Sequence, residues 1–482
     1  MPTNVLLTIA LAAVFPGRRS ASGAMNILTL ILVLSFNQVL SVIAYSPPTT
    51  LSRYGGWIPS SRTVHDSFIT NQLKRAASPM STNQSHTAPV ARFENAIKAN
   101  EEMVKLIDEV FKQAAPENKI ESFNQLLYAM DPIVISPPSF HIATDDQGNP
   151  TGESIGVPMY LLFDLLSNTG AAYQLFQMES FNSALKDLLD SWGEYLMTPD
   201  SNKTLTDSEE GWFGQAALAS LEDKGRGIFN QTYVCPDPAV VSCGYGSWDE
   251  FFTRKFADGA RPIIRPQNGT NNLIYSACES TPYRIASKVK AHDQFWLKAQ
   301  RYSIYDMLGG DSNTTKQFVG GTVYQAFLSP QDYHRWHAPV DGVIVRAEVL
   351  PGSYYAALPD EGAEIGDPDL QPGAPYGVAI RSQAWIAHAS TRAIIYIQAD
   401  NPDLGLVAFI GIGMAEVSTC ALSVEEGQIV KAGEELGMFH FGGSSHALIF
   451  GPQVDLTFAR DVEIDKHVKI NSVLARFSKP FF

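Results

Sequence analysis

The segment "GMFHFGGSSHALIF", residues 437–450, places two glycines and two serines in the middle of a hydrophobic strand pattern. Such a turn is usually a plain surface loop. Here it interrupts a segment that should be buried, where unpaired backbone groups are costly. Glycine reaches backbone angles forbidden to other residues, so Gly442 and Gly443 leave the Gly443 carbonyl open to the Ser444 hydroxyl. The pattern indicates a chemical role for this bond.

The chemistry available to the Gly443–Ser444 bond is an attack by the serine on its own chain. The Ser444 hydroxyl would convert the amide to an ester, and elimination of the ester would leave a dehydroalanine end at residue 444. Hydrolysis of that end produces a pyruvoyl group, which is an electrophilic ketone. This chemistry would cut the chain between Gly443 and Ser444.

Such an attack needs a base, and the best candidates are the two histidines of "YHRWHAPVDG", residues 333–342. His334 and His337 lie three residues apart in a stretch flanked by strand patterns. A structural or surface pair is one alternative interpretation. A metal site is another, but it lacks an obvious third ligand and the HExxH helix pattern. We expect no metal.

Four separated segments resemble the phosphatidylserine decarboxylase family, and they occur in the order that the family has. They are "SWDEFFTRKFADGARPI" (247–263), "FWLKAQRYSIYDMLGGD" (295–311), "YHRWHAP" (333–339) and "FGGSS" (441–445). The resemblance covers about residues 245–482. "SACES" (276–280) and "GMFHFGGSS" (437–445) look especially similar to the L-tryptophan decarboxylases of a fungal subgroup. The helical region before them resembles that subgroup's accessory domain.

The resemblance implies a self-cleaving enzyme whose covalent cofactor is a pyruvoyl group made from Ser444. His337 matches the base that activates the serine, and His334 matches the histidine linked to substrate turnover. Glu279, in "SACES", stands where the family has an aspartate that orients the base. A glutamate can hold a histidine tautomer in the same way, although its longer arm needs a shifted backbone.

The implied reaction is release of CO2 from an α-amino carboxylate through a Schiff base, with the pyruvoyl group as electron sink and His334 as candidate acid. Two substrates stay open: a free aromatic amino acid such as L-tryptophan, or phosphatidylserine, which would become phosphatidylethanolamine. A homologue that binds without catalysing is a third hypothesis. The two chains made by self-cleavage are expected to stay associated.

The net charge of −15 argues against a nucleic-acid partner, because such proteins need basic surface to neutralise phosphates. Four cysteines are too few for a disulfide scaffold. Cys235 and Cys243 could form one bridge, and two free thiols are at least as compatible with the sequence. Cys278 and Cys420 complete the set.

Residues 1–45 predict a signal peptide or a signal anchor, because Arg18 and Arg19 precede the apolar "AMNILTLILVLSFNQVLSVIAYS". This interpretation places the protein in the secretory pathway or at a membrane, which the apolar segment could contact. The alternatives are a mitochondrial presequence, or a cytoplasmic protein if Met25 is the true start.

The rest of the chain predicts an α+β protein with a helical amino-terminal accessory domain and a mostly β catalytic domain that has a few helices. Residues 46–92, rich in Ser, Thr and Pro, predict a flexible linker. Helical stripes of apolar residues at 93–111 and 181–196 indicate that the accessory domain spans 93–230. Short β-rich segments at 342–350, 392–400 and 404–414 belong to the catalytic domain, 231–482. The Gly/Pro/Asp-rich segment 359–377 predicts a long loop, either a functional lid or a disordered excursion.

Overall fold

The computed structural model describes residues 62–140, 142–144, 150–267, 271–292, 302–359, 375–417 and 419–479. The predicted signal segment and the central part of the predicted 359–377 loop lie outside these residues. A helical amino-terminal region is followed by a β-rich region of antiparallel sheets with few helices, which confirms the predicted fold class.

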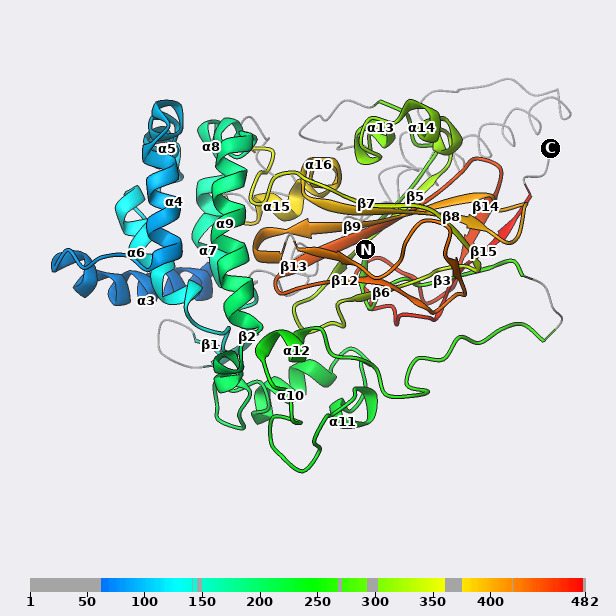
Figure 1. Cartoon of the computed structure of the whole chain (residues 1–482), viewed down its shortest axis with the longest axis horizontal. Coiled ribbons are helices and arrows are strands. Elements are labelled where there is room, and N and C mark those ends of the chain that lie inside the picture. The colour runs from blue at the N-terminus through cyan, green and yellow to red at the C-terminus, as the bar shows by residue number, and fades with distance from the viewer. Residues whose placement is uncertain are drawn as a thin grey trace, which may run out of the picture. The chain divides into compact units, whose positions relative to one another are not determined.

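The helical region is built from ten helices in the part of the chain described. They are α3 (Arg62–Ser81), α4 (Ala88–Lys98), α5 (Glu101–Gln113), α6 (Phe123–Val134), α7 (Pro158–Ser167), α8 (Gly170–Leu175), α9 (Glu179–Leu196), α10 (Gln215–Glu222), α11 (Phe229–Thr232) and α12 (Trp248–Phe252). A 3-10 helix η1 (Pro199–Thr204) and a hairpin of β1 (Ile142–Thr144) with β2 (Pro150–Ser154) complete it. Helices α4 and α9 run side by side (Figure 1).

Helix α3 corrects one prediction, because it occupies 20 residues of the stretch expected to be a flexible linker. Val64, Phe68, Ile69 and Ala76 of this helix are buried. Their spacing is helical, but the Ser, Thr and Asn residues between them lower the overall hydrophobicity of the segment and hide the stripe. Burial of a sparse apolar face therefore overrides the linker-like composition.

Helix α9 follows the predicted stripe, since its apolar face is buried. The buried residues include Phe181, Leu185, Leu188, Leu189, Trp192 and Leu196. The stripe predicted from Phe93 to Phe111 is divided between α4 and α5. Asn100 caps α5 by accepting hydrogen bonds from the backbone N–H groups of Glu102 and Met103. The chain changes direction at this cap, so Val104 is exposed.

Three antiparallel sheets form the β-rich region. The seven-stranded sheet has the order β11-β7-β8-β9-β13-β5-β4, and the smaller sheets have the orders β10-β12-β6 and β14-β15-β3. The strands are β3 (Leu273–Tyr275), β4 (Thr281–Ser287), β5 (Thr322–Leu328), β6 (Arg335–His337), β7 (Gly342–Leu350), β8 (Arg392–Ala399), β9 (Leu406–Met414), β10 (Cys420–Leu422), β11 (Ile429–Val430), β12 (Glu435–Phe439), β13 (Gly443–Phe450), β14 (Asp455–Phe458) and β15 (Val473–Ser478). Among the described residues of this region, four short helices accompany them: α13 (Ile304–Met307), α14 (Ser312–Phe318), α15 (Val378–Arg381) and α16 (Gln383–Ala389).

The two faces of β13 contribute to two different hydrophobic cores. Ala447 and Ile449 pack with the helical region, whereas Leu448 and Phe450 pack with the strands β6 and β12. Successive side chains of a strand point to opposite faces. The strand is therefore buried on both sides, which explains its nearly continuous apolar sequence after residue 446.

The strand pair β6–β12 packs on the seven-stranded sheet through Trp336, which is fully buried. A methyl group at Gly411 of β9 would stand 2.9 Å from the Trp336 ring, and one at Gly437 of β12 would stand 2.8 Å from it. Both glycines are needed because the indole lies directly against the backbone of each strand. This contact sets the spacing between the histidine strand β6 and the sheet that holds β13.

A disulfide joins Cys235 and Cys243, whose Cα atoms are 4.7 Å apart, while Cys278 and Cys420 are free. Of the two states left open by the sequence, the structure has the bridge. Among the helices in the described residues, none combines the length and the apolar character that crossing a membrane requires.

Candidate active site

Ser444 is the second residue of β13, a strand that lies between β9 and β5. It is fully buried, and its Oγ atom has no hydrogen-bond partner among the described residues. Directly opposite it stand Gly413 of β9 and Leu328 of β5. Leaving a buried hydroxyl unpaired is unfavourable, and together with the preceding glycine turn this makes Ser444 the candidate nucleophile.

The segment that leads into Ser444 is anchored on both sides. The Phe439 N–H donates to the His334 carbonyl, and His440 Nδ1 lies 2.9 Å from the Asp249 carboxylate of α12. The Phe441 ring packs edge-on against Trp248 at 4.5 Å between ring centroids. Gly442 then has a φ of +131°, which side chains disfavour. The predicted chain break thus follows a fixed, glycine-specific turn.

His334 lies just before β6, fully buried, with its ring stacked on Phe252 at 3.9 Å between centroids. Neither ring nitrogen has a hydrogen-bond partner within the described part of the chain. Burial lowers the pKa of His334 to about 3, and the nearby Arg254 cation acts in the same direction. The imidazole is therefore neutral at physiological pH.

His337, in β6, has both ring nitrogens engaged. Nε2 lies 3.1 Å from the Tyr333 hydroxyl, and Nδ1 lies 3.2 Å from Oδ1 of Asn471. Asn471 uses its Nδ2 to donate to the Arg261 carbonyl, so its Oδ1 is the acceptor and His337 Nδ1 carries the hydrogen. Burial lowers the pKa of His337 to about 4. Nε2 is thus the basic nitrogen.

Glu279 is fully buried, and its carboxylate has other partners than His337. Arg261 Nε donates to Oε1 at 2.7 Å, and the Ile470 N–H donates to Oε2 at 3.0 Å. His467 Nε2 stands 3.7 Å from Oε2. No hydrogen bond between Glu279 and His337 is present in the residues that the structure describes. The predicted orienting role of Glu279 stays a prediction.

The structure places Ser444 and the histidine strand on the same side of the seven-stranded sheet. Ser444 and Leu328 are directly opposite and so share a face, and Leu328 belongs to the core that contains Trp336 of β6. Ser444 nevertheless has no hydrogen bond to His334 or His337 among the described atoms. The site combines a buried nucleophile without a partner and two neutral imidazoles.

A buried ionic network that was not predicted from the sequence lies next to the histidines. Asp332 accepts from Arg226 Nε at 2.6 Å and from the Ser329 N–H at 2.7 Å, and it lies 3.2 Å from His467 Nε2. Burial alone would raise the pKa of Asp332, but Arg226 and His467 hold that pKa below its ordinary value. Of these residues only Asp332 adjoins the histidine motif, so the network had no local signal in the sequence.

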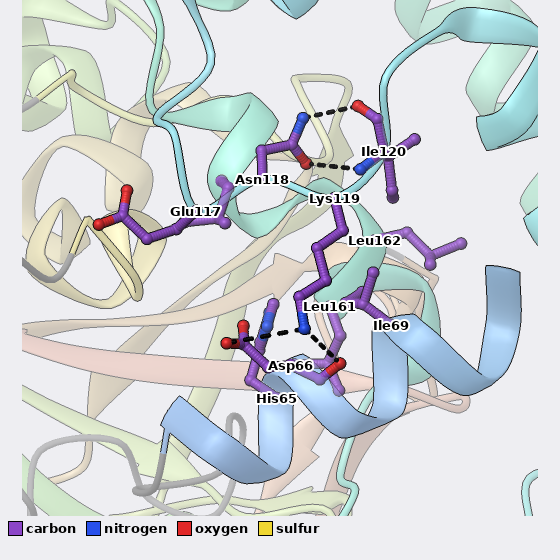
Figure 2. A pocket seen from close by; sticks show the side chains of 10 residues that line it. His65, Asp66, Ile69, Glu117, Asn118, Lys119, Ile120, Leu161 and Leu162 are labelled. Carbon is purple, nitrogen blue, oxygen red and sulfur yellow. Dashed lines mark hydrogen bonds and ion pairs between the residues drawn. The ribbon is translucent and has the colours of Figure 1, made fainter.

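A small cavity in the helical region contains none of the predicted site residues. Figure 2 shows it between α3, α7 and residues 117–120, with Lys119 donating to the Asp66 carbonyl at 3.2 Å. Its volume of about 10 Å³ leaves room for roughly one water molecule. It is too small to hold an amino acid.

Comparison with known proteins agrees with this arrangement of residues. A family model described as phosphatidylserine decarboxylase matches residues 248–476, and a second model of the same description matches residues 87–221. The chain is 54% identical over 350 residues to decarboxylase iboD of Amanita muscaria, covering 73% of this chain and 99% of that protein. It is 34% identical over 405 residues to L-tryptophan decarboxylase of Psilocybe cubensis, covering 82% and 87%.

More distant similarity extends to phosphatidylserine decarboxylase proenzyme 3 of Schizosaccharomyces pombe, at 32% identity over 48% of this chain and 21% of that protein. The chain belongs to the phosphatidylserine decarboxylase family. It is a decarboxylase of that family, a carboxy-lyase.

Proposed function

We propose that the chain cleaves itself between Gly443 and Ser444 and then decarboxylates a free amino acid, with an aromatic one such as L-tryptophan as the model substrate. The observation that carries the proposal is the buried, unpartnered Ser444 hydroxyl at the start of β13, directly after the glycine-specific turn at Gly442. Proenzymes are named among the relatives, which supports a processing step.

The cleavage step balances as an acyl shift followed by elimination. His337 Nε2 takes the Ser444 hydroxyl proton, Oγ bonds to the Gly443 carbonyl carbon, and the Gly443–Ser444 C–N bond breaks as its nitrogen gains a proton. Loss of the Ser444 Cα proton then breaks the Cβ–Oγ bond and frees Gly443 as a carboxylate. Water hydrolyses the remaining enamine, after its conversion to an imine, and releases ammonia.

This cleavage requires His337 to exchange its Tyr333 contact for the serine. The Tyr333 hydroxyl now occupies Nε2, and burial raises the pKa of Tyr333, so it keeps its proton and donates. A small movement of the Tyr333 side chain would release the lone pair of Nε2. The contacts of His337 thus hold the base in the correct tautomer.

The residues present fit a pyruvoyl group at position 444. Such a group supplies a carbonyl that condenses with an amine and accepts the electron pair released with CO2. On the side of the sheet where Ser444 lies, Trp336 and its neighbours form a hydrophobic core, which lowers the polarity around the reacting atoms.

His334 is our candidate for returning a proton to the substrate carbon. Its imidazole is neutral in the uncleaved chain because burial lowers its pKa. A substrate carboxylate nearby would favour the protonated form of this imidazole. His334 would then hold the proton that the carbon needs after CO2 has left.

The choice of a free amino acid rests on how much of the chain the relatives share. The proteins named as L-tryptophan decarboxylases match 82% of this chain, including the helical region, at 33–34% identity. The proteins named as phosphatidylserine decarboxylase proenzymes match between 46% and 55% of it, at 26–32% identity. Phosphatidylserine is the alternative substrate that the assay must exclude.

Intact-mass measurement of the purified protein tests the cleavage. We expect two fragments, the smaller beginning at residue 444 with a blocked amino terminus. Ser444→Ala should remain a single chain because it lacks the nucleophile, and His337→Ala should cleave on the order of 100-fold more slowly. A parent chain that stays whole would contradict the proposal, and it would favour a homologue that binds without catalysing.

The substrate is tested by CO2 release from the cleaved enzyme. L-tryptophan, L-phenylalanine, L-tyrosine and phosphatidylserine vesicles are compared at equal concentration, with Ser444→Ala as the blank. We expect release from an aromatic amino acid. Release from the lipid alone would overturn the substrate assignment and leave the cleavage proposal intact.

A further inference from the structure

We propose that Asn471 positions His337 for self-cleavage, and that Glu279 acts one contact further away by holding Asn471. The inference rests on the proposed function, since it assigns the support of the base in that reaction. The sequence predicts a direct contact between the Glu279 carboxylate and His337. In the structure the amide of Asn471 makes the contact with His337, and Glu279 holds that amide in place.

Among the described side chains, Asn471 bonds Nδ1 of His337. The other ring nitrogen, Nε2, is the one that must accept the Ser444 proton. The Oδ1 atom of Asn471 lies 3.2 Å from Nδ1, and its Nδ2 donates to the Arg261 carbonyl at 2.8 Å. The amide is buried, with 7% of its surface exposed. Because the Arg261 contact fixes which end of the amide is the acceptor, His337 is restricted to the tautomer with a free electron pair on Nε2.

Glu279 holds Asn471 through two separate contacts. Its Oε2 accepts the N–H of Ile470, the residue before Asn471, at 3.0 Å. Its Oε1 accepts from Nε of Arg261, the residue whose carbonyl receives the Asn471 amide, at 2.7 Å. The carboxylate thus positions both the backbone and the hydrogen-bond acceptor of Asn471. The backbone at Asn471 has a φ of +65°, so this support also maintains a conformation that few residues adopt.

An amide orients the imidazole without adding a negative charge beside it. A carboxylate in the same place would stabilise the imidazolium that forms as the serine loses its proton. Exchanging the amide for a carboxylate should therefore change the pH dependence of cleavage, which a purely structural role of Asn471 would not predict.

The charged and titratable groups around His337 are few and lie on known elements. Tyr333 and Arg335 are neighbours in sequence, and Glu435 approaches from β12. Arg335 donates to Glu435 at 2.8 Å, so these two charges largely offset one another. Arg261 and Glu279 form a second pair on the far side of Asn471, and His467 links Glu279 to the Asp332–Arg226 pair. A carboxylate introduced at position 471 would therefore be a charge in direct contact with His337 that has no ionic partner of its own.

The test is the first-order rate constant of self-cleavage in freshly refolded chain, followed by intact mass from pH 3.5 to 8, a range that includes the lowered pKa of His337. Asn471→Gly keeps the positive φ without strain and removes the amide. We expect its rate constant to fall on the order of 10-fold or more. Asn471→Asp should cleave at or above the parental rate, with the midpoint of its pH profile moved to higher pH. Asn83→Gly, an exposed asparagine with a φ of +50°, is the matched control.

The outcomes separate this inference from the proposed function. If the parent cleaves and His337→Ala does not, while Asn471→Gly cleaves at the parental rate, the inference is wrong and the proposed function stands. If the parent itself stays whole, the proposed function fails first. If Asn471→Gly does not refold, Asn471→Asp decides, because a pH profile identical to that of the parent would also overturn the role of Asn471.

Discussion

Burial lowers the pKa of several histidines below the ordinary value of this residue. Burial lowers the pKa of His334 and His446 to about 3 and that of His337 and His388 to about 4. In the unfolded chain they would titrate near 6.5. Between these values the unfolded state binds more protons, so each histidine reduces stability as the pH falls from about 6.5. The buried, neutral imidazoles of the site therefore lower the stability of the folded protein at acidic pH.

His446 shows this effect in isolation, because burial alone lowers its pKa and neither ring nitrogen has a partner among the described residues. We expect His446→Leu to gain stability relative to the parent as the pH falls from 6 to 4, by up to about 1.4 kcal/mol per pH unit. Urea unfolding at pH 7, 6, 5 and 4 measures the difference. A difference that is the same at every pH would show that His446 is not held neutral.

At the scale of elements, the contact of two sheets through Trp336 decides where the histidine strand lies. The indole fits because β9 and β12 each present a glycine to it. Neither His334 nor His337 pairs with the seven-stranded sheet through its main chain, since β6 pairs with β12 of the smaller sheet. The distance between base and nucleophile therefore depends on side-chain packing.

Gly437→Ala tests this contact. The added Cβ would stand 2.4 Å from the Ala421 carbonyl oxygen and 2.8 Å from the Trp336 ring, closer than atoms can approach. We expect a loss of stability of about 1–3 kcal/mol and slower self-cleavage, measured by urea unfolding and intact mass. Gly193→Ala in α9, where nothing lies within 4 Å, is the control and should be stabilising. A Gly437→Ala chain as stable and as rapidly cleaved as the parent would contradict the packing argument.

At the scale of the whole molecule, cleavage would break one peptide bond and leave the fold intact. The smaller product, residues 444–482, carries β13, β14 and β15. Strand β13 pairs on one side with β9 and on the other with β5, and β15 pairs with β3, all of which belong to the larger product. The two products share a sheet and two cores, so the cut leaves almost every contact of β13 in place.

We therefore expect the two products to stay together in solution. Gel filtration of the cleaved protein should give one peak at the elution volume of uncut Ser444→Ala, and both masses should appear in that peak. Addition of 6 M guanidinium chloride should separate them, because the contacts are not covalent. Loss of the smaller product under native conditions would be inconsistent with the pairing of β13.

The helical region is also joined to the sheet next to the proposed cleavage point. Glu416 follows β9 and accepts hydrogen bonds from the N–H groups of Met159 and Tyr160 at the start of α7, at 2.6 Å and 3.0 Å. A carboxylate is favourable at the amino end of a helix. Met414, two residues earlier, pairs with Gly443. The helical region thus supports the strand that faces the bond to be cut.

Local sequence was sufficient for features that depend on neighbouring residues. The strands at 342–350, 392–399 and 406–414 follow their predicted segments, and so does the buried face of α9. The turns at Gly427 and Gly433 have the positive φ that glycine allows. The serine, the histidines and their family were recognisable because each motif is contiguous. Where a stripe was sparse, as in α3, composition misled the prediction.

The sequence by itself thus determined which groups are available for chemistry: Ser444 after two glycines, and two histidines before a proline. The tertiary structure decided which groups touch one another. Asn471 lies 134 residues from His337 and bonds it, whereas the Glu279 carboxylate bonds Arg261 and the Ile470 backbone instead. In a core, the distance and direction between strands from remote parts of the chain determine which groups form hydrogen bonds. No local sequence pattern predicts such pairs.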